Sequence, residues 1–383
     1  MKPERPQHFR EGRRTHWSAP LRSRVFRGGV ASASVLAALA GAQALRRMGA
    51  AVAWPARGDD LRDEDFTLLD RDPARRVLTE DGVPLAARVV GAENADATVI
   101  FVHGFCNSMQ SFHFQRRDLA ELWGPRVRMV FFDLRGHGSS GTPSSASCTV
   151  SQLGRDLVRV IEECAPSGPL VLVGHSMGGM AILAAAAQFP QLFESRLLAT
   201  ALLSTTAAGV TRAGAAQLLR SPAIDGFRML VHTSPALVQA GRVTARQVIT
   251  PVLHVSSFHG DVSPTLSRFT TSMIDRTPVE TIVKFLEALE VHDESAAVPM
   301  LAPCPALVVG GGHDLIIPFR NSRELAARLP GADLVRVTDA AHMVHLQYPE
   351  LVNAALDRLL LRAGVFGAAP AASGTSDREV SNG

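Results

Sequence analysis

The sequence predicts an α/β fold in which an eight-stranded, mostly parallel sheet is flanked by helices. Three observations indicate this class. Short runs of β-branched and aromatic residues alternate with longer helix-like segments. Several of these runs are apolar without interruption, as is typical of strands buried on both faces. Glycine-rich and polar motifs stand directly after the runs, where the carboxyl ends of parallel strands form ligand sites.

The expected elements cover the chain from about residue 75 to residue 361. A hairpin of residues 77–79 and 84–90 around an Asp-Gly turn begins the sheet. Six further strands are expected at 98–102, 127–132, 170–173, 198–203, 306–309 and 333–337. Helices that cover the sheet are expected at 109–122, 150–164, 176–188, 322–329 and 350–361. Residues 78–204 and 301–365 therefore form the expected core.

Residues 205–300 separate the sixth strand from the seventh and are too long for a connection, which usually takes about 4–6 residues. Thr277, Pro278 and Glu280 have the pattern of a helix N-cap, a first helical position and a capping box. The segment is interpreted as a helical cap whose apolar side chains either line a substrate site or hold the cap on the core. The expected cap helices are 225–232, 243–249, 264–274 and 278–291, and the apolar residues are Phe227, Leu230, Val231, Val238, Leu253, Phe258, Phe269, Met273 and Phe285.

The first 77 residues form a leader ahead of the core. Residues 1–27 contain Lys2 and seven arginines against two glutamates and carry a net charge of +6, whereas the whole chain carries +3. The rest of the chain therefore carries −3 and gives no indication of a nucleic-acid partner. Residues 57–77 are dense in charges, which predicts a solvated linker.

An apolar segment at 28–45 lies between arginines and contains no charged residue. Its length suits a short membrane span or the apolar region of a signal peptide, and Ala42-Gln43-Ala44 has the small-x-small pattern of a cleavage site. An amphipathic helix and a disordered extension are the alternatives. We expect membrane association or export through this segment, with a cytoplasmic location as the alternative. The Ala-, Gly- and Ser-rich tail at 366–383 is expected to be disordered.

The four cysteines, Cys106, Cys148, Cys164 and Cys304, lack the C-x-x-C pairing of zinc or thioredoxin sites. We therefore expect no metal site and no cofactor. Cys106 and Cys148 each follow a predicted strand at one edge of the sheet. The sequence leaves open whether they form a disulfide or remain two ordinary thiols.

A candidate nucleophile follows the predicted strand at 170–173. Gly174, Ser176 and Gly178 form the pattern G-x-S-x-G, and a helix begins at once behind it. Such a turn holds its serine in a strained position between strand and helix, and glycines permit it because they lack a Cβ atom. Ser176 is therefore the expected nucleophile. The N–H of Met177, at the start of the helix, is placed to meet a developing oxyanion.

Four motifs together give the core its resemblance to the α/β-hydrolase family, in its esterase- and lipase-like branch with a helical cap. His-Gly-Phe at 103–105 resembles the oxyanion-hole turn after the third strand, and D-x-R-G-H-G-x-S at 133–140 resembles the loop after the fourth. The G-x-S-x-G at 174–178 resembles the nucleophile elbow after the fifth strand. The segment 342–350 resembles the one that holds the catalytic histidine ahead of the last helix. The resemblance implies this fold and serine hydrolase chemistry.

A serine needs a base to take its proton, and the base needs an acid to fix its tautomer. Asp314 lies in the loop after the strand at 306–309, where the resemblance places the acid, and His342 is the expected base. The chain order Ser176, Asp314, His342 matches the order of this fold. The resemblance also places the N–H of Phe105 beside that of Met177 in the oxyanion hole, while the Phe105 side chain lines the pocket or packs in the core.

Alternatives exist for the acid and the base. Glu290 and Asp293 end the helix before the seventh strand and are interpreted as solvated. His345 lies three residues after His342, at a position where the resemblance implies a second histidine. The histidines of the motif turns, His103, His137 and His175, are interpreted as groups that orient the backbone.

The resemblance and the apolar cap together predict a serine hydrolase that cleaves carboxylic esters of lipophilic substrates through an acyl-enzyme. A small-molecule or lipid ester is the expected partner. Acyl transfer, peptide cleavage, carbon–carbon bond hydrolysis and cofactor-free perhydrolysis use the same machinery and remain alternatives. A protein that binds a ligand without catalysis is the third hypothesis.

Overall fold

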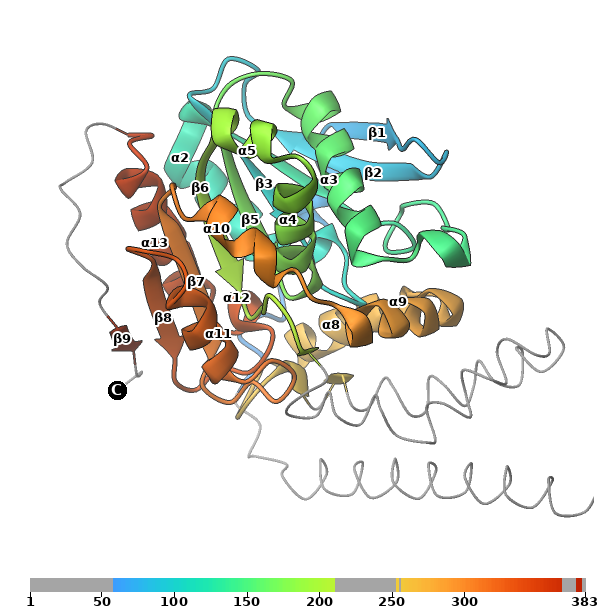
Figure 1. The fold of residues 1–383 in the computed structure, drawn as a ribbon. Coiled ribbons are helices and arrows are strands. Elements are labelled where there is room, and N and C mark those ends of the chain that lie inside the picture. Colours follow the sequence, from blue (N-terminus) through green and yellow to red (C-terminus); the bar gives the residue numbers. More distant parts are fainter. Residues whose placement is uncertain (1–57, 211–252, 255, 367–376, 381–383) are drawn as a thin grey trace, which may run out of the picture.

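The structure is a computed structural model that describes residues 58–210, 253–254, 256–366 and 377–380 (Figure 1). Its sheet has the strand order β1-β2-β4-β3-β5-β6-β7-β8-β9. β1 pairs antiparallel with β2, β2 pairs antiparallel with β4, and all pairs from β4 onward are parallel. The strands are β1 (Ala74–Leu78), β2 (Pro84–Val90), β3 (Ala97–Val102), β4 (Val127–Phe132), β5 (Leu170–His175), β6 (Leu197–Leu203), β7 (Ala306–Gly311), β8 (Asp333–Val337) and β9 (Asp377–Val380).

The eight strands predicted from the sequence are all present, and β9 is additional. It pairs in parallel with β8 at the edge of the sheet, from Leu334 opposite Asp377 to Val337 opposite Val380. The expectation of disorder was therefore wrong for residues 377–380. Backbone pairing to an exposed strand edge requires no apolar pattern, so composition alone could not indicate this strand.

Two apolar cores cover the two faces of the sheet, because alternate side chains of a strand point to opposite faces. Ile100 and Val102 of β3 pack with one set of helices, and Val99 and Phe101 pack with the other. The first set is α3 (Val150–Cys164), α4 (Met177–Gln188), α5 (Pro190–Arg196), α10 (Val298–Leu301) and α11 (Phe319–Ala326). The second set includes α2 (Ala120–Trp123) and α13 (Pro349–Arg362). This is the layered arrangement that the sequence predicted.

The single helix expected at 109–122 is divided into three short pieces. A 3-10 turn at Met109–Phe112 is followed by a π-helical turn at Gln115–Leu119 and then by α2. Gln115 is fully buried, and its side-chain amide donates to the carbonyl of His345 and to the side chain of Asn353. These long-range contacts fix the segment in a form that local helix propensity does not indicate.

Two of the expected cap helices are described, α8 (Pro264–Arg276) and α9 (Val279–Val291). Both lie on the side of the molecule to which the parallel strands point (Figure 1). The helices expected at 225–232 and 243–249 fall outside the described residues. The predicted capping box is wrong: Pro278 is the N-cap of α9, and the hydroxyl of Thr277 donates instead to the carbonyl of Met273 at the end of α8.

The segment 58–72, here named the strap, is packed against the protein although its charges predicted a solvated linker. Leu69 is fully buried, and Phe66 stacks on Phe269 of α8 with ring centroids 4.1 Å apart. Asp59 accepts a hydrogen bond of 2.7 Å from the hydroxyl of Thr265 at the start of α8. Apolar and acidic side chains of the strap thus both hold it on the protein, since Glu64 and Asp72 also form ion pairs with Arg117 and Arg116.

The apolar segment expected at 28–45 lies outside the described residues. In the part of the chain that the structure describes, no helix combines the length and apolar character needed to cross a membrane.

Candidate active site

Ser176 occupies a strained turn between β5 and α4. Its φ is 52° and its ψ is −119°, a conformation that residues with a side chain rarely adopt. The turn fits closely against β3, since a Cβ atom on Gly178 would lie 2.0 Å from the carbonyl oxygen of Val102. The Ser176 N–H donates to the carbonyl of Leu203, at 2.9 Å, and the Thr205 hydroxyl donates to the Ser176 carbonyl, at 2.7 Å. These contacts hold the strained serine at the carboxyl ends of the strands.

Ser176, His342 and Asp314 form a hydrogen-bonded row. The Oγ of Ser176 lies 3.0 Å from Nε2 of His342, and Nδ1 of His342 lies 2.9 Å from Oδ2 of Asp314. The exposed fractions of Ser176, His342 and Asp314 are 6%, 6% and 4%, so the row is largely shielded from solvent. The three residues come from the turn after β5, the loop after β7 and the loop after β8. The structure therefore brings together the three side chains that the sequence selected.

The alternatives for acid and base lie elsewhere. Asp293 is in a β-bridge with Ala208, and its carboxylate accepts from the N–H of Ser295. His345 is fully buried, with its ring 4.4 Å from that of His175 between centroids. Burial lowers the pKa of His345 to about 3, with a smaller contribution from His342. It is His342 and not His345 that lies against Ser176.

The two backbone N–H groups expected in the oxyanion hole are those of Met177 and Phe105. Met177 is the first residue of α4, and Phe105 lies in the turn after β3. Neither N–H donates to any group in the described part of the chain. The side chain of Phe105 is half-buried and packs against an apolar cluster that consists mainly of residues of α9, among them Ile282 and Val283. Its ring thus contacts the cap while its N–H stays available.

The loop after β4 is pinned to the segment after β3 by Asp133. Its carboxylate accepts two hydrogen bonds of 2.7 Å, from the N–H of Met109 and from that of Ser139. Burial raises the pKa of Asp133 to about 6, although the two N–H donors oppose the shift. The N–H of Leu134 donates to Nε2 of His103, at 2.9 Å. The turn after β3 and the loop after β4 therefore form one hydrogen-bonded unit.

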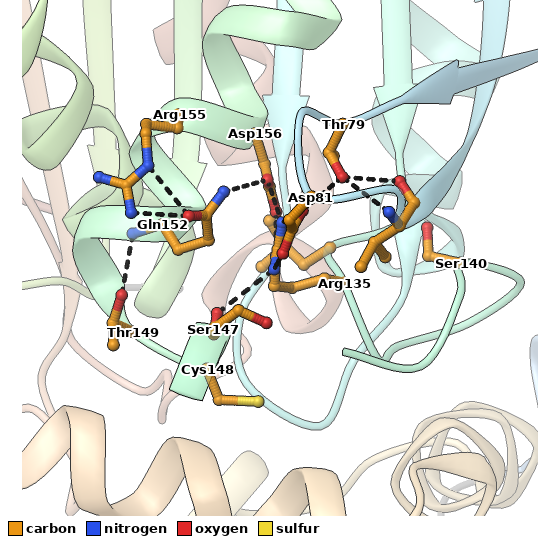
Figure 2. A network of polar contacts seen from close by, with 12 residues as sticks. Thr79, Asp81, Arg135, Ser140, Ser147, Cys148, Thr149, Gln152, Arg155 and Asp156 are labelled. Carbon is orange, nitrogen blue, oxygen red and sulfur yellow. Dashed lines mark hydrogen bonds and ion pairs between the residues drawn. The ribbon is translucent and has the colours of Figure 1, made fainter. Parts of the chain in front are cut away.

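Arg135 anchors the same loop, a role that the sequence analysis did not assign (Figure 2). Its guanidinium is fully buried and donates two hydrogen bonds of 2.6 Å to Asp156 of α3. Two more, of 2.7 and 2.9 Å, go to Asp81 in the turn between β1 and β2. Burial raises the pKa of Asp156, against the effect of Arg135. An aspartate among the apolar residues of α3 was the signal that could have indicated a buried partner.

The motif histidines contact backbone groups, in agreement with their interpretation. Nδ1 of His103 lies 2.8 Å from the carbonyl oxygen of Gly104, and Nδ1 of His137 lies 3.0 Å from that of Arg135. The Nε2–H of His175 donates to the carbonyl of His342, at 3.0 Å. Burial is the largest cause that lowers the pKa of all three side chains, so they are neutral at neutral pH.

The cysteines Cys106, Cys148, Cys164 and Cys304 are all free thiols, so Cys106 and Cys148 do not form the disulfide that the sequence left open. Burial raises the pKa of both thiols. Among the described residues, no group of three or more His, Cys, Asp or Glu side chains is arranged to hold a metal ion.

Comparison with known proteins places this geometry in context. Residues 97–349 match the sequence profile of the family described as alpha/beta hydrolase fold. A sn-1-specific diacylglycerol lipase of Danio rerio is 25% identical over 291 residues, which cover 76% of this chain and 87% of the relative. A putative carbamate hydrolase of Caulobacter sp. is 27% identical over 234 residues, covering 60% of this chain and 80% of the relative.

Solved structures show the same fold. A thermophilic esterase from Thermogutta terrifontis superimposes with a TM-score of 0.61 and 24% identity, over 76% of this chain and 99% of the esterase. An esterase from Exiguobacterium antarcticum superimposes with a TM-score of 0.60 and 18% identity, over 74% of this chain and 98% of that protein. At these identities the likeness establishes the architecture alone.

Proposed function

Because the chain belongs to the alpha/beta hydrolase fold family, we propose that it is a serine hydrolase that cleaves carboxylic esters of lipophilic substrates through an acyl-enzyme. The observation that carries the proposal is the row of hydrogen bonds from Ser176 through His342 to Asp314. An isolated serine hydroxyl is a weak nucleophile, and this row supplies the base and the acid that activate it.

The first half of the reaction forms the acyl-enzyme. Nε2 of His342 takes the hydroxyl proton while Oγ of Ser176 bonds to the ester carbonyl carbon, and the carbonyl electrons move onto oxygen. The N–H groups of Phe105 and Met177 donate to this oxyanion, and Asp314 stabilises the imidazolium. The oxyanion then collapses, the ester C–O bond breaks, and the Nε2–H of His342 protonates the departing alcohol.

The second half releases the acid. Nε2 of His342 takes a proton from a water molecule, whose oxygen bonds to the acyl carbon and forms a second oxyanion in the same site. Collapse breaks the bond to Oγ of Ser176, which recovers its proton from His342. The donors face both oxyanions without rearrangement, so their contribution is largest in the two transition states.

Apolar side chains beside the row support a lipophilic substrate. Phe105 packs against an apolar cluster formed by Cys106 and residues of α9. Met343 follows His342 directly and belongs to a second apolar cluster, against which Phe258 and Phe269 of the cap region pack. The relative named as a diacylglycerol lipase is in keeping with a lipid ester, although the class of ester rests on these apolar contacts.

A fluorophosphonate probe tests the proposed nucleophile. Wild-type protein should be labelled covalently, and Ser176→Ala should not. Ser204→Ala is the matched control, since Ser204 is also buried, follows the neighbouring strand β6 directly and has a positive φ of 44°. It should be labelled like the wild type. An unlabelled wild type, or a labelled Ser176→Ala, would refute the proposal.

Esters of p-nitrophenol with increasing acyl length test the substrate class. We expect kcat/KM to rise with chain length, because each added methylene is buried among apolar side chains. Adding an alcohol beside water distinguishes hydrolysis from acyl transfer: the proposal requires the free acid as the main product. Amide and carbamate substrates in the same assay cover the other reactions of this machinery.

A further inference from the structure

The peptide group between Gly104 and Phe105 supplies one of the two proposed oxyanion donors. A trans peptide is planar, with its C=O and N–H pointing to opposite sides. Whatever holds the Gly104 carbonyl therefore also sets the direction of the Phe105 N–H. This carbonyl oxygen lies 2.8 Å from Nδ1 of His103 and accepts the N–H of Asn107 at 3.2 Å.

The hydrogen bonds of His103 define which of its nitrogens carries the proton. Nε2 accepts the N–H of Leu134, at 2.9 Å, so this nitrogen must present a lone pair. The proton of the neutral ring is then on Nδ1, and Nδ1–H donates to the Gly104 carbonyl. The side chain of His103 is fully buried, and burial lowers its pKa to about 3, so this form persists at neutral pH.

The imidazole of His103 thus connects the ends of two neighbouring strands. His103 follows β3 and Leu134 follows β4, and these strands pair in parallel up to Val102 opposite Phe132. The Leu134 N–H is itself fixed, because the adjacent Asp133 is held by two backbone donors. The imidazole therefore links the Leu134 N–H, after β4, to the Gly104 carbonyl in the turn after β3.

The peptide that the ring holds lies directly beside the nucleophile. A Cβ atom on Gly104 would come within 3.0 Å of Cβ of Ser176 and 2.7 Å of Nδ1 of His175. The Phe105 N–H is two bonds further along the chain from the Gly104 Cα. A rotation of this peptide would turn the carbonyl oxygen toward the site and replace a donor by an acceptor.

We infer that His103 is a positioning residue, whose Nδ1–H holds the Gly104 carbonyl so that the Phe105 N–H faces the oxyanion. The inference rests on the proposed function. His103 itself touches neither the substrate nor Ser176 and acts only through the peptide that follows it.

Two substitutions separate the contacts of the ring. In His103→Asn the side-chain amide reaches the position of Nδ1 and still offers a donor to Gly104. In His103→Gln the amide reaches the position of Nε2, where it meets Leu134 and leaves the Gly104 carbonyl without its donor. Each variant keeps one buried hydrogen bond and loses the other, so their melting temperatures should be similar.

We expect kcat to fall in His103→Gln and not in His103→Asn. His103→Gln should lower kcat toward p-nitrophenyl esters by about 100-fold with little change in KM, because the lost contact acts in the transition state. His103→Asn should keep most of the wild-type kcat. Wild-type turnover in His103→Gln, or equal losses in the two variants, would overturn the inference, since equal losses indicate general loosening of the site.

A structural readout keeps this result separate from the proposed function. Crystal structures of the variants should show the peptide between Gly104 and Phe105 turned in His103→Gln and unchanged in His103→Asn. Nitrogen-15 spectra of the wild type should place the His103 proton on Nδ1. If the wild type hydrolyses no ester, the proposed function fails while these measurements still decide the inference: an unmoved peptide, or a proton on Nε2, overturns it.

Discussion

Asp314 holds His342 with one carboxylate oxygen and the backbone with the other. Oδ2 lies 2.9 Å from Nδ1 of His342, while Oδ1 accepts the N–H groups of Ile316 and Ile317 at 2.9 and 2.8 Å. The carboxylate is fixed in orientation because both oxygens are engaged. It therefore favours a proton on Nδ1 of His342 and a lone pair on Nε2, which faces Ser176.

Replacing Asp314 by asparagine should remove this control of the tautomer. The amide can donate to Nδ1, which then loses its proton to Nε2, so that the histidine cannot act as a base toward Ser176. We expect kcat to fall by about 10⁴-fold with KM nearly unchanged. Steady-state kinetics of Asp314→Asn on a p-nitrophenyl ester would measure both constants. Asp293→Asn, the rejected alternative acid, should turn over like the wild type, and a large loss there would contradict the assignment.

Asp133 should make stability depend on pH between about 4 and 6. Its pKa in the folded protein is about 6, against an ordinary value of 3.8, because burial disfavours the carboxylate. In this range the folded state keeps the proton that the unfolded state has lost. The free energy of unfolding should therefore decrease as pH rises, by about 3 kcal/mol in total, and stay level above pH 6 as far as this group is concerned.

Urea unfolding of wild type and Asp133→Asn at several pH values would measure this effect. Asparagine does not titrate, so the difference between the two free energies isolates the carboxyl group. We expect this difference to favour the variant progressively from pH 4 to pH 6. A constant difference would mean that the carboxyl group has the same pKa in both states.

Sequence analysis could predict the parts of the site that depend on strand order. Ser176, Asp314 and His342 each follow a strand, and parallel strands deliver their carboxyl ends to one edge. The contacts that support these three residues were harder to predict from the sequence. Arg135 binds Asp156 across two elements, and Phe66 lies on a helix about 200 positions further along the chain. The partner in either contact cannot be identified from a local pattern, because both contacts depend on packing that only the folded chain creates.

Removing Arg135 should destabilise the fold, because it leaves the fully buried carboxylate of Asp156 without its cation. We expect Arg135→Met to lower the free energy of unfolding by about 3–5 kcal/mol. Arg159→Met is the matched control. Arg159 also binds two carboxylates, those of Glu162 and Glu163, but it does so on the exposed surface of α3, the helix that carries Asp156. Arg159→Met should lower the free energy of unfolding by less than about 1 kcal/mol.

Denaturant unfolding of both arginine variants provides the comparison. Adding Asp156→Asn to Arg135→Met should recover part of the loss, because the buried negative charge is then gone. Similar costs for Arg135→Met and Arg159→Met would show that burial does not control the strength of these ion pairs.

The stacking of Phe66 on Phe269 should couple the strap to the cap. The ring planes are 22° apart, and both side chains are half-buried, so part of the contact energy comes from the aromatic pair itself. A double-mutant cycle with Phe66→Ala and Phe269→Ala should give a coupling energy of about 0.5–1.5 kcal/mol in the free energy of unfolding. Leu78, which is 60% exposed on β1, supplies the reference: Phe66→Ala and Leu78→Ala should be additive. Additivity of the two phenylalanine substitutions would instead mean that the stacked pair adds no stability of its own, and that the remaining contacts, such as that of Asp59 with Thr265, hold the strap on α8.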